Sequence, residues 1–419
     1  MKRLMVMSVI LVVTCGMSVF MIACGGGGGG GGGSMDSLLF FQTGEATHGL
    51  ELWVSDRSAA GTTMLVDIRP GAEDSNPFYF TPFNGRLYFS ADDGTRGQEL
   101  WATDGTAEGT TLVVEIADGA ADPNVTTLIV FDERLFFSAN DGTRGYELWA
   151  TDGTAAGTTL AIEIIPGSAG GNPYHMAVAG SWMYFKALDP TRGYELWKTD
   201  GTAQSTTLVA DIRPGGPYDH GSPVRMTALG DKVYFCADDG VRGEELWSSD
   251  GTAEGTTLVA DFWPGSGGTI NMWLSVFDGR LYVSADDGVR GKELWVTDGT
   301  ANGTTLVADI WPGAEASYPG DFQVFNGRMY FSARDAARGS ELWATDGTAE
   351  GTTLVADIWP GDGHSGPGDM VVLNGRLYFT ANDETRGENL WATDGTAAGT
   401  TLVVDLATTS SLRDLTVFP

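Results

Sequence analysis

Short runs rich in Val, Leu, Tyr and Phe alternate with tight-turn signals along almost the whole chain. Dipeptides such as Asn84-Gly85, Asn326-Gly327 and Asn374-Gly375 predict type I′ hairpins, because both central residues of that turn need positive φ. No segment shows a sustained helical period, so the pattern predicts an all-β fold. Counting turns predicts four strands in each unit, and those of the last full unit are residues 369–373, 376–381, 388–393 and 400–406.

A tryptophan recurs along the chain in steps of 48 residues, with one step of 50. Its positions are Trp53, Trp101, Trp149, Trp197, Trp247, Trp295, Trp343 and Trp391. Around each tryptophan the same pattern returns, for example Glu99-Leu100-Trp101-Ala102-Thr103-Asp104-Gly105-Thr106. This pattern resembles the ELWxxDGT repeat family over nearly everything after Asp36. The resemblance implies a β-propeller-like repeat in exported bacterial proteins, and it implies no established activity.

The strand runs and the two chain ends together predict a closed ring. Runs such as Leu87-Tyr88-Phe89 are apolar on both faces, as expected when every sheet is covered by a neighbour on either side. The chain ends with an extra copy of the first strand of a unit, and the first unit lacks that strand. We therefore predict an eight-bladed β-propeller over residues 36–419, with four-stranded antiparallel blades. Leu415 to Phe418 should pair with Leu38 to Gln42, which closes the ring without a free sheet edge.

The first residues predict export. Two basic residues precede an apolar run that ends at Ala23, which is typical of a secretory signal over residues 1–23. Cys24 resembles the lipid-modified cysteine of a bacterial lipobox, with Met21 where that family usually has Leu. Residues 24–35 would then be a lipidated cysteine and a Gly-rich tether. An uncleaved membrane anchor is the alternative, because about 20 apolar residues can span a bilayer. Both interpretations place the propeller at the bacterial cell envelope, either on the periplasmic side of the outer membrane or at the cell surface.

The formal charge of the chain is -31, from 24 Lys and Arg against 55 Asp and Glu. Charge of this sign repels phosphate backbones and anionic headgroups, so we expect no nucleic-acid partner and membrane contact only through the lipid anchor. We expect a monomer. Once Cys15 has left with the signal and Cys24 carries lipid, Cys236 is the remaining cysteine, and we expect it to be a small buried thiol.

Several residues recur at fixed distances from the tryptophan. The tryptophan itself is expected to pack between blades, and Asp104 to hold a tight turn. Asp93 and Arg96 share one loop. Calcium is one interpretation of such acidic loops, but calcium needs six to eight oxygen ligands, and an arginine inside the loop favours an Arg–carboxylate pair. We therefore expect no cofactor, with calcium as the alternative.

Glu and Trp two residues apart on a strand share one face, and an arginine lies nearby in the sequence. Multivalent propeller lectins use these residue types to hold a sugar, so the units predict candidate repeated ligand sites. In the second and third units these are Arg96, Glu99, Trp101, Arg144, Glu147 and Trp149.

The connections between blades vary most, and they should share a face with the loops between second and third strands. Function is expected on that face. The candidate ligand-binding residues there are Tyr79, Tyr174, His175, Tyr218, His220, Trp273, Tyr318 and His364. Three of them, His175, His220 and His364, would meet at a metal only if their loops lean toward the axis.

The sequence contains no G-x-S-x-G elbow, P-loop or H-E-x-x-H motif. We therefore predict a non-catalytic binding or scaffolding module at the cell envelope, whose partner is an unknown protein, peptide or glycan. A multivalent carbohydrate-binding lectin with equivalent sites between blades is the alternative. A hydrolase or lyase with one site at the central channel is the second alternative, and it would need residues that break the repeat, such as His175, Asp219 or His220.

Overall fold

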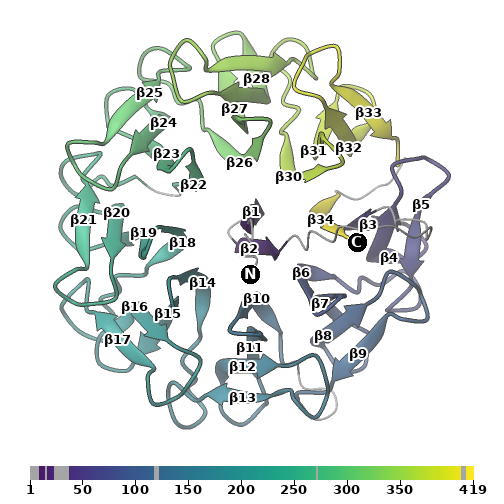
Figure 1. Ribbon diagram of the computed structural model, residues 1–419, viewed down its shortest axis with the longest axis vertical. Coiled ribbons are helices and arrows are strands. Elements are labelled where there is room, and N and C mark those ends of the chain that lie inside the picture. The colour runs from purple at the N-terminus through teal and green to yellow at the C-terminus, as the bar shows by residue number, and fades with distance from the viewer. Residues whose placement is uncertain (1–8, 15–16, 23–36, 118–121, 270–271, 407–411) are drawn as a thin grey trace, which may run out of the picture.

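The computed structural model describes residues 9–14, 17–22, 37–117, 122–269, 272–406 and 412–419. These residues form eight four-stranded antiparallel sheets and one two-stranded sheet, and no helix occurs among them. The eight four-stranded sheets surround a central opening as the blades of a propeller (Figure 1). The predicted all-β, eight-bladed β-propeller is therefore confirmed. Within the same residues, nothing forms a helix long and apolar enough to cross a bilayer.

Each blade has an inner strand beside the opening, two middle strands and an outer strand at the rim. The inner strands are β34 (Arg413–Phe418), β6 (Phe78–Phe83), β10 (Thr126–Phe131), β14 (Tyr174–Ala179), β18 (Val224–Leu229), β22 (Leu274–Phe277), β26 (Gly320–Phe325) and β30 (Gly368–Leu373). The second strands are β3 (Leu38–Glu45), β7 (Arg86–Asp92), β11 (Arg134–Asn140), β15 (Trp182–Asp189), β19 (Lys232–Asp238), β23 (Arg280–Asp286), β27 (Arg328–Asp335) and β31 (Arg376–Asp383).

The two remaining strands of each blade lie farther from the opening. The third strands are β4 (Gly49–Ser55), β8 (Gln98–Thr103), β12 (Tyr146–Thr151), β16 (Gly193–Thr199), β20 (Glu244–Ser249), β24 (Lys292–Thr297), β28 (Arg338–Thr345) and β32 (Gly387–Thr393). The outer strands are β5 (Thr62–Val66), β9 (Thr111–Val114), β13 (Thr159–Ile162), β17 (Thr207–Ala210), β21 (Thr257–Ala260), β25 (Thr305–Ala308), β29 (Thr353–Ala356) and β33 (Thr401–Val404).

The two ends of the chain share one blade. β34 pairs antiparallel with β3, and the register places Leu38 opposite Phe418 and Leu39 opposite Val417. The strand order in that blade is β34-β3-β4-β5, so the last strand of the chain supplies the inner strand that the first unit lacks. The predicted closure of the ring by the C-terminal strand is confirmed.

Local turn chemistry explains the tight connections within a blade. At the hairpin between β6 and β7, Asn84 has φ 48° and Gly85 has φ 73°, and the other two Asn-Gly pairs match these values closely. Both residues of the turn therefore have the positive φ that a type I′ turn requires.

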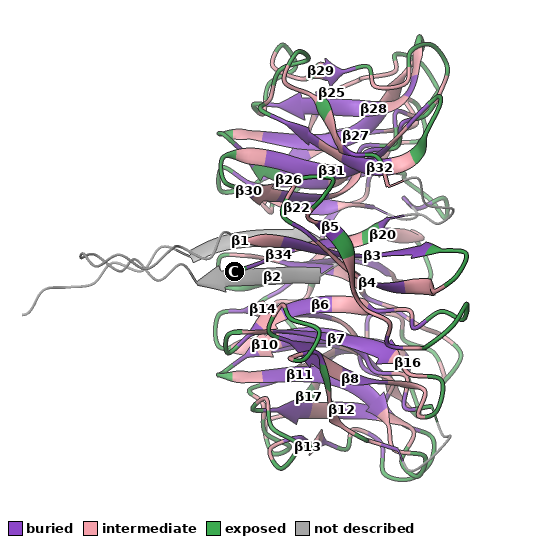
Figure 2. Cartoon of the chain, turned by 90° about the vertical axis from the view of Figure 1, so that its right-hand side faces the viewer, coloured by how far each residue is buried: buried purple, intermediate pink, exposed green. Residues whose placement is uncertain are grey.

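Neighbouring blades bury their apolar faces against each other, so the buried residues follow the strands and the exposed ones follow the loops (Figure 2). One cluster joins Phe40 and Leu52 of the first blade to Leu87 and Phe89 of the second, with Trp101 packed against it. Eight such clusters lie around the ring. The predicted packing of the repeated tryptophan between blades is confirmed.

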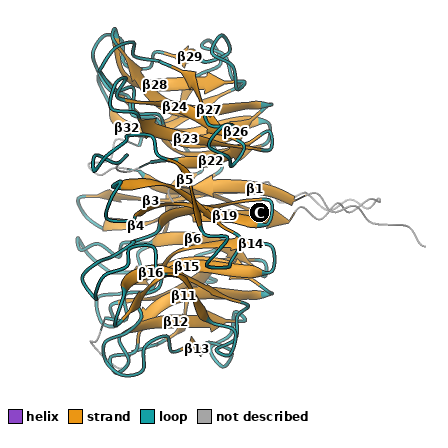
Figure 3. Cartoon of the chain, turned by 90° about the vertical axis from the view of Figure 1, so that its left-hand side faces the viewer, coloured by secondary structure: helices purple, strands orange, loops and turns teal. Residues whose placement is uncertain are grey.

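The loops lie at the two faces of the ring (Figure 3). On one face, the loop between second and third strands meets the connection that leads to the next blade. The backbone N–H of Leu50 donates to Asp74 Oδ1 at 2.8 Å, and the N–H of Gln98 donates to Asp122 Oδ1 at 2.9 Å. The predicted sharing of one face by these loops and connections is therefore correct.

The two-stranded sheet lies in the central opening (Figure 1). It consists of β1 (Val9–Thr14) and β2 (Met17–Ile22), which belong to the predicted signal. β1 contacts β26 and β30, and β2 contacts β10, β14 and β18. The opening is therefore wide enough for two extended strands. Cys24 and the whole of the predicted tether, residues 24–35, lie outside the described residues.

Candidate functional site

The acidic loops hold an ion pair of their own. Asp93 Oδ1 accepts hydrogen bonds from the backbone N–H groups of Thr95 and Arg96, while Asp93 Oδ2 pairs with the guanidinium of Arg96. Arg96 Nε also lies 3.6 Å from Glu115. Burial alone would raise the pKa of Asp93, but these hydrogen bonds outweigh it and hold the pKa below its usual value. Arg144 pairs with Asp141 in the same way in the next blade, so the predicted Arg–carboxylate pairs are present.

The repeated glutamates have a structural role that keeps them from a ligand. Glu99 and Glu147 are fully buried. Glu99 accepts hydrogen bonds from the backbone N–H of Ile116, 3.0 Å from Oε1 and 3.1 Å from Oε2, and Glu147 accepts one from Ile164 at 2.7 Å. Each glutamate thus ties a third strand to the connection that follows its outer strand, and burial raises the pKa of both to about 7.

This burial corrects the prediction of repeated ligand sites. A sugar cannot reach Glu99 or Glu147, and the neighbouring Trp101 and Trp149 pack against the interblade clusters. Of the predicted set, the Arg96 and Arg144 side chains keep substantial exposure, and both are already paired with aspartates. The repeated glutamate carboxylates, which the lectin alternative required as sugar ligands, are therefore not accessible to a sugar.

The loop aromatics and histidines do not all gather at one place. Tyr218 is 90% exposed and Tyr318 is 55% exposed. His220 Nδ1 accepts a hydrogen bond from the N–H of Tyr194 at 3.0 Å, and His364 Nδ1 accepts one from Ser340 at 2.9 Å. Both histidines therefore do what Asp74 and Asp122 do in other blades. In the described part of the chain, no group of three or more His, Cys, Asp or Glu side chains has the arrangement of a metal site.

Three of the predicted residues occupy equivalent positions in their blades, at the inner strands beside the central channel. Tyr79 and His175 are each the second residue of an inner strand, and Trp273 directly precedes β22. The corresponding residues of the other blades complete one set, at the same spacing before the repeated tryptophan wherever one follows. We call this set the channel ring, and its members are Tyr79, Thr127, His175, Arg225, Trp273, Asp321, Asp369 and Asp414.

A backbone irregularity places these side chains. Seven of the eight ring residues have φ between 46° and 64°, in the left-handed region that non-glycine residues rarely adopt. In seven of the eight inner strands, β22 being the exception, the strand register shifts at this point, for example between Phe78 and Thr81 of β6. Such bulges commonly redirect a side chain next to a functional site, and a β-branched residue such as Thr127 pays a steric cost to adopt this conformation.

Three neighbouring ring residues are aspartates, and we call Asp321, Asp369 and Asp414 the acidic arc. The carboxylate of Asp369 accepts a hydrogen bond from the backbone N–H of Asp414, whose own carboxylate accepts one from the backbone N–H of Tyr79. Burial, together with the charges of Asp414, Asp321 and Glu388, raises the pKa of Asp369 to about 7. Burial raises the pKa of Asp414 and that of Asp321 to about 6. Carboxyl groups that share a site titrate near neutral pH for this reason.

The cationic arc, Lys186 and Arg225, lies elsewhere on the channel wall and flanks His175. Burial and the charges of Lys186 and Arg225 lower the pKa of His175 to about 4, so its imidazole is neutral at physiological pH. The guanidinium of Arg225 stacks on Trp273, with Cζ 4.6 Å from the ring centroid. The channel wall is therefore acidic over β26, β30 and β34 and cationic over β15 and β18.

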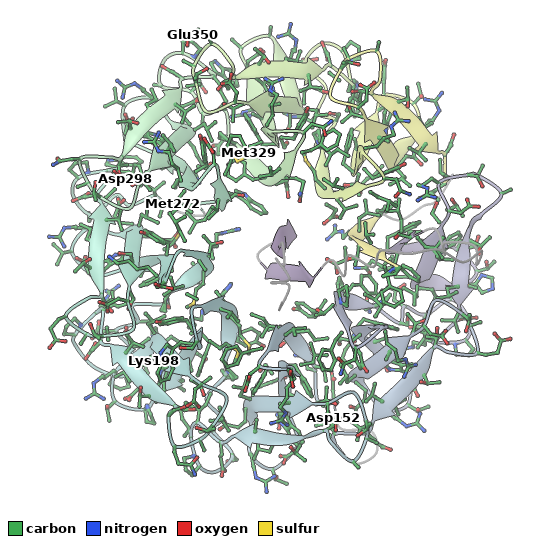
Figure 4. The ribbon with its side chains drawn as sticks, viewed as in Figure 1. Asp152, Lys198, Met272, Asp298, Met329 and Glu350 are labelled. Carbon is green, nitrogen blue, oxygen red and sulfur yellow. The ribbon has the colours of Figure 1, made fainter. Side chains whose placement is uncertain are left out.

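Ring residues that belong to the acidic and cationic arcs were missed by the sequence reasoning, which looked for aromatic and histidine side chains in loops. One signal was available. In the seven units from Trp101 onward, the position 22 residues before the tryptophan carries six different residue types, whereas the tryptophan itself is present in every unit. Figure 4 shows the contrast in position: the turn residues Asp152, Asp298 and Glu350 lie at the outer rim, whereas Met272, next to Trp273, lies toward the opening.

No protein-family model matches the chain, and no curated protein sequence matches it significantly. Its fold is similar to solved structures of prolyl endopeptidases, with a TM-score of 0.49 and 13% identity over 80% of this chain and 50% of that one. A puromycin-hydrolyzing peptidase from Mycobacterium tuberculosis gives a TM-score of 0.49 and 12% identity over 84% of this chain and 55% of that one. The β-propeller domain of the trilobed protease from Pyrococcus furiosus gives 0.44 and 11%, over 78% of this chain and 97% of that one.

The chain spans about half the length of the first two proteins. All three similar structures come from hydrolytic enzymes, so the comparisons do not support the prediction of a non-catalytic binding or scaffolding module. At these identities the likeness shows the fold. The case for a particular chemistry therefore depends on the channel residues themselves.

Proposed function

We propose that the protein is a hydrolase with one site in the central channel, where Asp369 and Asp414 act as a general acid–base pair. The observation that supports this most is their arrangement on the channel ring, where the carboxylate of Asp369 accepts a hydrogen bond from the backbone N–H of Asp414 and the two carboxyl groups have pKa values of about 7 and about 6. The ring is also where the units differ from one another. A single asymmetric site needs such differences, and the repeated residues cannot provide them.

The pair has the protonation states that hydrolysis needs. Both pKa values are raised toward neutral pH, so near pH 6.5 the pair can hold one proton between its two carboxyl groups. Asp414 would take a proton from a water molecule as its oxygen adds to the carbonyl carbon of a peptide bond. Asp369 would give its proton to the nitrogen that leaves, and transfer of a proton from Asp414 to Asp369 would restore both groups.

A peptide suits the charge of the ring. The acidic arc and the cationic arc face one channel, and a peptide carries both kinds of charge at its termini. The aromatic rings of Tyr79 and Trp273, both half-buried on the same ring, offer apolar surface between the two arcs. The channel is wide enough for an extended chain, since it accommodates β1 and β2.

The test is turnover of a quenched fluorogenic peptide library by protein purified from an exporting host. Wild type should cleave members of the library fastest near pH 6.5. Asp369→Asn and Asp414→Asn should each lower kcat by at least about 100-fold, which is typical of removing a general acid or base. Asp362→Asn, at an exposed position in the connection before β30, is the matched control and should retain full activity. Absence of cleavage across the library, or full activity of Asp369→Asn, would refute the proposal.

We also propose that the protein is a lipoprotein of the ELWxxDGT repeat type, anchored through Cys24 at the cell envelope. The signal-like residues 1–23 and the repeated motif support this. Metabolic labelling with a palmitate analogue should mark wild type and leave Cys24→Ala unlabelled. Labelling of the variant would contradict attachment at Cys24.

A further inference from the structure

Lys186 stands at a position where the other blades have a small or neutral residue. It lies on β15 opposite Tyr174, the residue before His175. The equivalent residues are no more than 8% exposed, and they are Gln42, Ser90, Ser138, Cys236, Ser284, Ser332 and Thr380. One blade has therefore placed a charge where the repeat otherwise has none, directly beneath the channel ring.

Neither cation of the cationic arc has a carboxylate partner. Among the described residues, Lys186 and Arg225 form no ion pair within 4.0 Å, whereas Arg96 and most other loop arginines are paired with aspartates. The Lys186 ammonium lies 5.2 Å from the ring centroid of Tyr194, and the Arg225 guanidinium stacks on Trp273. Aromatic faces stabilise a cation without neutralising it, so both charges stay available.

Two unpaired cations near His175 carry an energetic cost. A partly buried charge loses hydration, and burial lowers the pKa of Lys186. The chain has 55 acidic residues, yet neither cation forms an ion pair within 4.0 Å among the described residues, and the charge of Arg225 acts on Asp321 only at longer range. An anion from outside would offset the cost, and a planar guanidinium and an ammonium are the usual protein groups that hold one.

We propose that Lys186 and Arg225 bind the carboxylate of a ligand in the channel, with Trp273 as an apolar surface beside it. This deepens the proposed function, on which it rests in naming the ligand: the substrate is a peptide held by its free C-terminal carboxylate. Arg225 would offer two N–H groups to the two carboxylate oxygens, and Lys186 would add a third donor. The acidic arc would then face a more distant part of the same peptide.

The test measures binding alone, so that it can succeed or fail independently of turnover. In an Asp369→Asn background, isothermal titration calorimetry compares N-acetyl-trialanine with its C-terminal amide. The acid should bind at least about tenfold more tightly than the amide, as expected for charge-assisted hydrogen bonds. Lys186→Gln and Arg225→Gln should each remove that preference, and high salt should weaken it.

Lys198→Gln is the matched control. Lys198 lies on β16 of the same blade with its ammonium 4.2 Å from the ring centroid of Trp182, and Figure 4 places it away from the opening. This variant should bind the acid as the parent does. Thermal melts identify a variant that fails to fold. In that case the other substitution and the salt dependence of binding decide whether these cations bind the carboxylate.

Three results would overturn the assignment. Equal affinity for acid and amide, including no binding of either, rules out carboxylate recognition. If both Lys186→Gln and Arg225→Gln keep the preference for the acid, the carboxylate-binding site lies elsewhere. Displacement of the acid by inorganic phosphate at lower concentration than by acetate would identify a phosphate site in its place. If the acid binds as expected while no peptide is cleaved by wild type, the hydrolase proposal fails and the carboxylate site stands.

Discussion

Removal of the last six residues, 414–419, tests whether the ring depends on its C-terminal strand. The deletion removes Leu415, Val417 and Phe418, whose exposed fractions are 0%, 9% and 4%. Burial of each such side chain contributes roughly 1.5 to 3 kcal/mol, so the loss is about 5 to 9 kcal/mol. A folded domain is typically stable by about 5 to 15 kcal/mol, so most of that margin would disappear.

Two consequences should be measurable. The melting temperature, followed by circular dichroism at 218 nm or calorimetry, should fall by on the order of 10 °C or more. The truncated protein should also associate, because β3 loses its partner and presents an unpaired edge, which size-exclusion chromatography would detect. Deletion of Pro419 alone is the control, since that residue is exposed and outside β34.

A truncated protein that melts within about 2 °C of the full chain would refute the reasoning. It would mean that β3 and its neighbours bury their apolar faces without β34. A large fall for the Pro419 control would equally show that the six-residue deletion reports something other than strand pairing.

Three further substitutions test the roles of the repeated residues. Glu99 has a folded pKa of about 7 against 4.5 for the unfolded chain, so the folded state binds the proton more tightly and this glutamate costs stability as pH rises from 4.5 through 7. In urea titrations, the free energy of unfolding should fall between pH 4.5 and pH 8 by up to about 3 kcal/mol less in Glu99→Gln than in wild type. An equal fall in both proteins would contradict the raised pKa. Asp104→Ala removes the acceptor of the Thr106 N–H and hydroxyl and should lower the melting temperature by a few degrees. Arg96→Ala breaks an exposed pair and should leave the melt unchanged, so a marked fall would show that this loop pair supports the fold.

The ring architecture could be predicted from the sequence because its signals are local and repeated. The spacing of Trp101 and its counterparts set the number of blades, and Asn84-Gly85 marked a hairpin. The match between the chain ends and the halves of one blade identified the closure. Each of these signals depends on residues close together in the sequence, and the repetition of the unit eight times made the pattern easier to recognise.

The channel site could not be predicted in the same way. Asp369 was expected at the start of an ordinary strand, where successive side chains point to opposite faces of the sheet. The bulge gives it φ 46° and brings it to the channel wall, and nothing in the residue type announces that conformation. Glu99 was expected beside Trp101 on an accessible face. Its burial comes from a connection that folds over it, with Ile116 as the hydrogen-bond donor.

The pairing of Leu38 with Phe418 has a consequence for how the chain may be cut and rejoined. Leu38 and Phe418 lie opposite each other in an antiparallel pair, so in a propeller without residues 1–36 a hairpin of a few residues could join its two ends. New ends could then be opened in any connection between blades, giving a circular permutant in which every blade is continuous in sequence. Such a protein would have the same architecture but no interlocked blade, and mechanical pulling should separate its first and last blades more easily than in the natural order.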